Sequence, residues 1–215
     1  MQLIPPNIQL DISDRNLLSI INQESTNQIY ELTDSFKFIM AFNAKCESET
    51  FNVSGCFAVA TRKKVTISKL SKNASVVVIN VLGFNGLEDK ITILDKQDVP
   101  GNLSYIDGCS NTNIIDPPRN GDPCINYLYI PAGTNQTFHT HPSVRIILIL
   151  AGEGMCSLKD SEVPLMAGQI YNLPRHTIHR FKTTDKSLSV MVFHPDSEDG
   201  PRDEHNPMKS RTYIK

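Results

Sequence analysis

The sequence has no long apolar stretch, no excess of one charge sign and few long helical patterns. The longest apolar run covers about residues 146–151 and is far too short to span a bilayer as a helix. The formal net charge of −2 for 215 residues gives no electrostatic footprint for nucleic acid or an anionic membrane surface. The start of the chain has no basic segment followed by an apolar one, so we predict no signal peptide. We therefore expect neither a nucleic-acid partner nor a membrane partner.

Several chemistry-bearing motifs are also missing. The sequence has no GxSxG, Walker A, HExxH or GxGxxG segment. No two of the five cysteines form a CxxC pair, and their number is odd. Without an export signal, this pattern predicts reduced, mostly buried thiols rather than a disulfide framework, and a cytoplasmic protein. The cysteines are Cys46, Cys56, Cys109, Cys124 and Cys156.

Histidine is absent from the first half of the chain, which also has no other cluster with metal-ligand character. All six histidines lie in the second half, so any chemistry is expected there. Their positions are His139, His141, His176, His179, His194 and His205.

The pattern along the chain is mainly that of β-strands. Residues 13–24 predict one short helix, with Ser13 or Asp14 as its N-cap. Short runs of β-branched and aromatic residues predict strands at 35–44, 49–62, 64–70, 74–84, 125–133, 136–141, 144–152, 153–158, 170–176 and 188–194. We expect an all-β protein with a β-rich region (1–100), a connector (101–123), a β-domain (124–195) and a polar tail (196–215).

His139 and His141 are two residues apart in one predicted strand. Side chains at this spacing point to the same face of a strand, where two imidazoles can bind one ion of Fe, Zn, Cu or Ni. The pair alone is weak evidence, because two exposed or hydrogen-bonded strand histidines have the same spacing. The surrounding residues therefore decide its interpretation.

The surrounding residues resemble the two motifs of the cupin superfamily. The first motif, G-x5-H-x-H-x3/4-E-x6-G, is matched by Gly133, His139, His141 and Gly152, with Arg145 at the glutamate position. The second motif, G-x5-P-x-G-x2-H-x3-N, is matched by Gly168, Pro174 and His179, with His176 at the glycine position and Thr183 at the asparagine position. We also expect the first strand after the histidine pair to end in a turn at Gly152 and Gly154.

The resemblance implies a fold, a metal site and an assembly. The fold is a double-stranded β-helix, a jelly-roll barrel, and the N-terminal half is either a degenerate second cupin or a separate β-rich region. His139, His141 and His179 would hold a divalent metal, with Fe(II) expected first and Zn, Mn or Ni as alternatives. A homodimer is the default assembly of the family.

Arg145 replaces the carboxylate ligand, and a guanidinium cannot bind a metal. One interpretation is a decayed site in which Arg145 makes a structural ion pair. The other, which we favour, is a three-histidine centre in which Arg145 binds the carboxylate of a small anionic substrate. The pattern then resembles three-histidine cupin dioxygenases, which use ferrous iron and dioxygen. The alternatives are a metal-dependent lyase, isomerase or hydrolase, a ligand-binding cupin without catalysis, and a metal-free storage-type or structural bicupin.

Two further residues are candidates for catalysis. His176, at the barrel mouth, is a second-layer group, an acid/base or simply exposed. Tyr127, like Tyr129 two residues further on, would line the pocket and donate its hydroxyl to a bound oxygen species, although core packing is more common for a strand tyrosine. We expect His194 and His205 to have no role in the site, whereas the tail with Asp203 and Glu204 could fold over the mouth as a lid.

Overall fold

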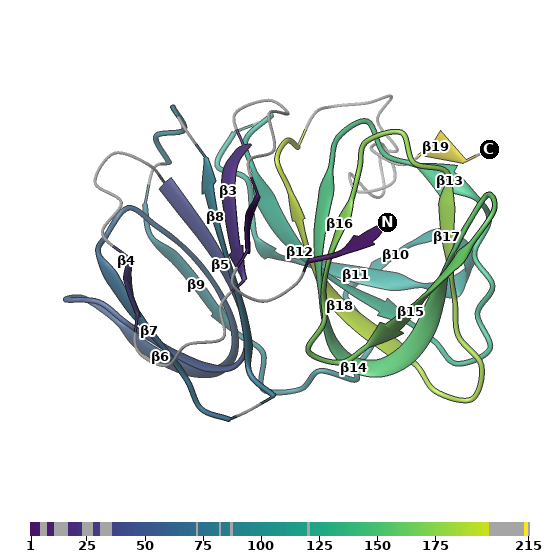
Figure 1. Ribbon diagram of the computed structural model, residues 1–215, viewed down its shortest axis with the longest axis horizontal. Coiled ribbons are helices and arrows are strands. Elements are labelled where there is room, and N and C mark those ends of the chain that lie inside the picture. The colour runs from purple at the N-terminus through teal and green to yellow at the C-terminus, as the bar shows by residue number, and fades with distance from the viewer. Residues whose placement is uncertain are drawn as a thin grey trace. The chain divides into compact units, whose positions relative to one another are not determined.

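The chain forms two compact units, an N-terminal unit of residues 4–95 and a C-terminal unit of residues 1–3 and 96–215. The computed structural model describes residues 1–4, 8–10, 17–22, 28–30, 36–71, 73–81, 83–86, 88–119, 121–197 and 213–214. Strands dominate this part of the chain and all their pairings are antiparallel, which confirms the all-β prediction (Figure 1). No helix in it is long and apolar enough to cross a membrane.

The N-terminal unit is built on one sheet whose main order is β2-β3-β8-β5-β6-β9, with β7 between β5 and β4. Its strands are β2 (Ile8–Leu10), β3 (Leu17–Asn22), β4 (Gln28–Tyr30), β5 (Phe36–Glu47), β6 (Asn52–Thr61), β7 (Val65–Lys69), β8 (Ser75–Val81) and β9 (Lys90–Ile93). Its core consists of small and β-branched side chains around Phe57. The apolar interior leaves no donor set for a metal among the described residues of this unit.

The helix predicted for residues 13–24 is wrong, because residues Leu17–Asn22 form strand β3. This strand pairs with β2 on one side and with β8 on the other, from Leu17 opposite Val81 to Asn22 opposite Val77. A short apolar run has no periodicity that separates helix from strand. These residues form a strand because they pair with the edge of β8. A local sequence pattern contains no information about such pairing.

The strands of the C-terminal unit curve around one interior (Figure 1). The main path of pairing is β10-β11-β12-β18-β14-β17-β13-β19, while β16 pairs with β1 and β14, and β15 pairs with β14. The elements are β1 (Gln2–Leu3), β10 (Leu103–Ser104), the 3-10 turn η1 (Ile106–Gly108), β11 (Ser110–Ile115), β12 (Cys124–Ile130), β13 (His139–Thr140), β14 (Arg145–Leu158), β15 (Glu162–Met166), β16 (Ile170–Leu173), β17 (His179–Lys182), β18 (Leu188–His194) and β19 (Tyr213–Ile214).

Strand β14 joins the two sheets of this barrel. Its first part pairs with β16 and β18, and its second part pairs with β15 and β17. The predicted turn at Gly152 and Gly154 is therefore wrong, since the strand continues through both glycines. Gly152 has a φ of 80° and follows a register shift between Ile149 and Ala151, so it marks a bulge at which the strand bends from one sheet to the other.

Residues 101–123, expected as a connector, contain strands β10 and β11. Strand β11 is paired with β12 along most of its length and therefore belongs to the barrel wall. Pro, Gly, Asn and Asp mark turns in sequence, but here Asn residues occupy strand positions because β12 offers an edge to pair with.

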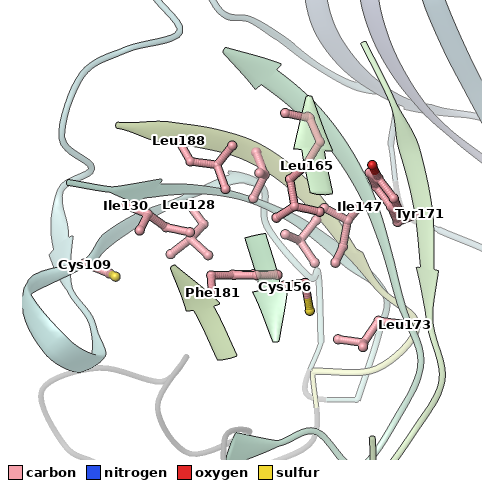
Figure 2. Close-up of a cluster of buried hydrophobic side chains, with 13 residues drawn as sticks. Cys109, Leu128, Ile130, Ile147, Cys156, Leu165, Tyr171, Leu173, Phe181 and Leu188 are labelled. Carbon is pink, nitrogen blue, oxygen red and sulfur yellow. The ribbon is translucent and has the colours of Figure 1, made fainter. Parts of the chain in front are cut away.

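The barrel core lies between its two sheets. In Figure 2, Leu128 and Ile130 of β12 point toward Phe181 of β17, with Leu165 and Leu188 beside them. These residues are buried. Burial of each such side chain stabilises a domain by roughly 1.5–3 kcal/mol. This packing stabilises the strands that carry the histidines.

Candidate functional site

Two neighbouring strands bring the three motif histidines together. His139 on β13 lies directly opposite His179 on β17 in an antiparallel pair. His141 follows β13 two residues after His139. Side chains on opposite residues of neighbouring strands point to the same face, so the pairing turns two motifs that are 40 residues apart into one cluster.

The ring nitrogens of this cluster are placed for one ion. The three ligand atoms lie within 4.8 Å of one another, and the ring centroids are 4.3 Å apart for His139 and His179 and 5.1–5.2 Å for the pairs with His141. Two nitrogens bound to one ion at roughly 2.1 Å lie at most about 4 Å apart. Small side-chain rotations therefore suffice to bring all three nitrogens to one metal, and the residues fit a divalent ion.

Backbone carbonyls orient two of the rings. Nδ1 of His139 is 2.9 Å from the carbonyl oxygen of Thr137, and Nδ1 of His179 is 2.9 Å from that of Thr177. A carbonyl oxygen only accepts, so each Nδ1 donates and each neutral ring has its lone pair on Nε2. Thr137 is itself held by Asp107, which accepts hydrogen bonds from the Thr137 backbone N–H at 2.5 Å and hydroxyl at 3.2 Å. Such supporting hydrogen bonds are typical of histidine metal ligands.

Burial keeps these imidazoles neutral. Loss of solvent, together with a smaller contribution from the neighbouring His139, lowers the pKa of His179 to about 3. Loss of solvent also lowers the pKa of His139, with a smaller contribution from the positive charge of Arg145. Metal binding requires unprotonated imidazole, so at neutral pH no proton competes with the ion at either ring.

The three histidines line a cavity of about 50 Å³ inside the barrel. At about 10–15 Å³ per water on this measure, it holds roughly three to five water-sized groups. None of its lining residues, all from the described part of the chain, is Asp or Glu. They are Tyr105, Asn111, Asn126, Leu128, Gln136, His139, His141, Arg145, Ile147, Leu173, His179, Phe181, Val192 and His194.

Arg145 lines the same cavity, as the motif register predicted. Its side chain is 1% exposed. Nη1 donates to the Ser143 carbonyl oxygen at 3.1 Å, the Ser143 hydroxyl at 2.5 Å and the Val144 carbonyl oxygen at 3.0 Å. These contacts fix a guanidinium that stays charged at any ordinary pH. The cavity thus contains one permanent positive charge close to the histidines.

Tyr127 does not lie in the cavity, contrary to our expectation. Along β12 the side chains that reach the cavity are Asn126 and Leu128, so Tyr127 points to the other face. Its hydroxyl lies within hydrogen-bond distance of the Gln97 and Val99 carbonyl oxygens and of the Ser189 hydroxyl, so it donates its one proton within this group. Tyr127 therefore fastens the segment before β10 to the outside of the barrel, and Tyr129 lies on the same outer face.

His176 is exposed and is not among the cavity-lining residues. Its φ of 58° explains why glycine stands at this position of the motif, since few other residues adopt a positive φ without strain. Its backbone N–H donates to the carbonyl oxygen of His141 at 2.8 Å. The structure thus gives the backbone of His176 a part in positioning His141, and it does not bring the imidazole into the cavity.

Thr183 replaces the motif asparagine and is buried. Its hydroxyl donates to the Pro131 carbonyl oxygen at 2.5 Å and accepts from the Thr134 backbone N–H at 2.9 Å. These bonds tie the end of β17 to the loop that precedes β13. Thr183 therefore supports the two ligand strands.

Sequence reasoning missed five polar residues of the cavity wall, namely Tyr105, Asn111, Asn126, Gln136 and His194. His194 was expected to have no role, yet it continues the inward-facing row of β18 after Val190 and Val192. The alternation along this strand was the available signal for it. Asn111 had no signal, because its strand was read as a connector.

The tail shows one strand in the described part. Tyr213–Ile214 pairs with β13, with Ile214 opposite His139 and Tyr213 opposite Thr140. The C-terminal strand thus covers the edge of the strand that carries a motif histidine. His205, Asp203 and Glu204, and with them the lid expected for this tail, lie outside the described residues.

All five cysteines are free and buried, as predicted. Burial raises the pKa of Cys109 to about 11 and of Cys156 to about 12. Nucleophilic thiols have lowered pKa values, so neither has the character of a nucleophile. Glu153, which lies within strand β14, is exposed and pairs with Lys186 at 3.2 Å.

Comparisons with known proteins agree with this architecture. A cupin domain model matches residues 126–195. Among solved structures, a cupin 2 conserved barrel domain protein from Leptotrichia buccalis is 12% identical, with a TM-score of 0.60 over 88% of this chain and 88% of that chain. An IolB-like protein from Salmonella typhimurium is 11% identical, with a TM-score of 0.58 over 92% of this chain and 86% of that chain.

A protein from Pseudomonas syringae whose function is unknown is 14% identical, with a TM-score of 0.59 over 86% of this chain and 85% of that chain. At these identities the likeness concerns the fold alone, and it extends over both units. No curated protein matches this chain. The matched model shows a cupin domain at residues 126–195, and the similar solved structures share the barrel fold.

Proposed function

We propose that this chain is a cupin metalloenzyme in which His139, His141 and His179 hold a divalent ion, and that it is a three-histidine Fe(II) dioxygenase for a small carboxylate-bearing substrate. The observation that carries the proposal is the donor set. Three imidazoles converge on one cavity, and no carboxylate lines it within the described residues. A decayed site would have no reason to keep three rings together, two of them oriented by backbone carbonyls.

Charge in the cavity favours an anionic substrate. Three neutral ligands leave the full charge of a divalent ion uncompensated, and Arg145 adds a second positive charge in the same enclosed space. A guanidinium binds a carboxylate through two parallel hydrogen bonds, which also orients it. Arg145 would therefore hold the substrate carboxylate beside the metal, where a glutamate ligand would repel it.

Part of the remaining wall is apolar. Leu128, Ile147 and Val192 are buried and apolar, and they strengthen every electrostatic contact inside the cavity by lowering the local dielectric constant. Ferrous iron, when bound, would supply redox chemistry with dioxygen. A dioxygenase inserts both oxygen atoms into the substrate, which provides all four electrons, so no external reductant is needed.

Metal analysis of protein purified without oxygen tests this proposal. We expect about one iron per chain in the wild type and a loss of iron in His139→Ala. His176→Ala is the matched control, because its side chain is exposed outside the cavity, and it should retain iron. Oxygen uptake with a panel of small carboxylates then tests for the dioxygenase.

The other outcomes point to the alternatives. Zinc, manganese or nickel, with turnover that does not require oxygen, would indicate a lyase, isomerase or hydrolase that uses the ion as a Lewis acid. Absence of any metal after reconstitution would contradict the three-histidine centre and indicate a ligand-binding barrel.

We also propose a cytoplasmic location and a homodimer. The five buried free thiols support a reducing compartment, and the family resemblance supports the dimer. Light scattering of the purified protein would give the mass of the assembly, to be compared with the chain mass of 24.0 kDa.

A further inference from the structure

One wall of the cavity is polar although it belongs to an otherwise apolar barrel interior. Asn111 on β11, Asn126 on β12 and His194 on β18 contribute to it. All three are buried, with exposed fractions of 3%, 2% and 6%. Apolar side chains at these positions would continue the rows of Leu128 and Val192, so the polar groups need a reason other than packing.

Two of these residues form a hydrogen bond with each other. Nδ2 of Asn126 lies 2.9 Å from Nε2 of His194. The register supports the contact, because Asn126 is opposite Val192 and His194 is the next residue on the same face of β18. This pair therefore has an explanation within the wall.

Asn111 differs from this pair. It lies opposite Leu128, a cavity residue, and so faces the interior. Its Oδ1 is fully buried and accepts no hydrogen bond within the described part of the chain. A buried acceptor without a donor is unfavourable, and in a cavity wall the missing donor can be supplied by a ligand.

We propose that Asn111 is a specificity-determining residue, whose Oδ1 accepts a hydrogen bond from a hydroxyl or amino group of the bound carboxylate. This inference rests on the proposed function, in which Arg145 holds the carboxylate. The ligand class is then a small hydroxy- or amino-carboxylate, in keeping with the cavity of about 50 Å³. A simple carboxylate of the same size leaves the Asn111 oxygen without a donor and binds more weakly.

Glycolate and acetate, which differ by one hydroxyl group, test the proposal. Their affinities for zinc-loaded protein are measured by isothermal titration calorimetry, so that no turnover is involved. We expect Asn111→Leu to reduce the preference for glycolate over acetate by about tenfold, the factor of one ordinary hydrogen bond. Asn111→Ala removes the same oxygen without adding bulk and should give the same loss if the leucine variant does not fold.

Asn113→Leu is the matched control. Asn113 lies two residues along the same strand. Its Oδ1 is also buried and has no hydrogen-bond partner among the described residues, but Asn113 does not line the cavity. The preference should survive this change. An equal loss in Asn113→Leu and Asn111→Leu would assign the effect to strand distortion and overturn the proposal.

Failure of the inference is distinguishable from failure of the proposed function. If zinc binds and Arg145→Gln weakens acetate, but the glycolate preference is unchanged in Asn111→Leu, only the role of Asn111 is overturned. If zinc does not bind, or Arg145→Gln leaves acetate affinity unchanged, the proposed function fails and the inference fails with it.

Discussion

Replacement of Gly152 by alanine tests whether the bend of β14 depends on this glycine. Gly152 has a φ of 80°, and an added Cβ would lie 1.8 Å from the carbonyl oxygen of Ser187 and 2.8 Å from its carbonyl carbon. Gly133, the first glycine of the same motif, has a similar φ of 74°, but no atom of the described residues lies within 4 Å of the added Cβ. Comparison of Gly152→Ala with Gly133→Ala separates the cost of backbone strain, which both variants share, from the cost of steric overlap, which only Gly152→Ala has.

The expected magnitudes follow from this difference. Alanine in the left-handed region costs about 1–2 kcal/mol, and this is the whole effect expected for Gly133→Ala. In Gly152→Ala the strands β14 and β18 must also move apart by more than about 1 Å, which adds roughly 1–3 kcal/mol of packing strain and lost hydrogen bonding. We therefore expect a total destabilisation of about 2–5 kcal/mol for Gly152→Ala.

Thermal unfolding followed by circular dichroism measures both variants. At roughly 2–4 °C per kcal/mol, Gly152→Ala should lower the Tm of the C-terminal unit by about 4–20 °C and Gly133→Ala by about 2–8 °C. Equal shifts in the two variants would refute the reasoning, because steric overlap with Ser187 would then contribute nothing.

Four further perturbations test the site and its support. Arg145→Gln should weaken acetate binding to the zinc-loaded protein by roughly 10- to 100-fold without loss of zinc, and unchanged calorimetric affinity would contradict a role in carboxylate binding. His176→Gly should change the free energy of unfolding by less than about 1 kcal/mol or raise it, because the φ of 58° suits glycine; a clear fall in Tm would contradict this. Deletion of residues 213–215 removes β19, one of the two strands that pair with β13, and should raise the zinc dissociation constant by up to about tenfold, as measured by chelator competition; no change would show that β19 does not support the ligands. The native protein should react slowly with a thiol reagent at about pH 8, since burial raises the pKa of Cys46 and Cys156 to about 12, while the unfolded chain should expose five thiols; rapid labelling of the folded protein would contradict their burial.

The three-histidine cluster was predictable from the sequence because its determinants are local. Side chains two apart in a strand share a face, which places His139 and His141 together. The motif glycines also have local causes, since Gly133, Gly152 and Gly168 all adopt positive φ. The motif spacing then related His179 to the pair and aligned Arg145 with the glutamate position.

Other features depended on pairing between distant segments. Residues Leu17–Asn22 form a strand because β8 lies beside them, and their apolar pattern alone suited a helix equally well. Strand β11, which contains Asn111, was not predicted because its segment is rich in turn residues. Tyr127 was assigned to the wrong face because the facing of β12 is set by its neighbours β11 and β18.

By itself, the sequence determined the β-rich class, the barrel with its two motifs, and the identity of the three histidines and Arg145. These depend on strand periodicity and on short spacings, which do not require knowledge of distant contacts. Only the tertiary structure decided which other side chains share the cavity and that Asn126 and His194 form a hydrogen bond with each other. It also decided that the Asn111 Oδ1 accepts no hydrogen bond from the part of the chain that the structure describes. The physical reason is that strand register, which places a side chain inside or outside a barrel, is a property of two paired strands.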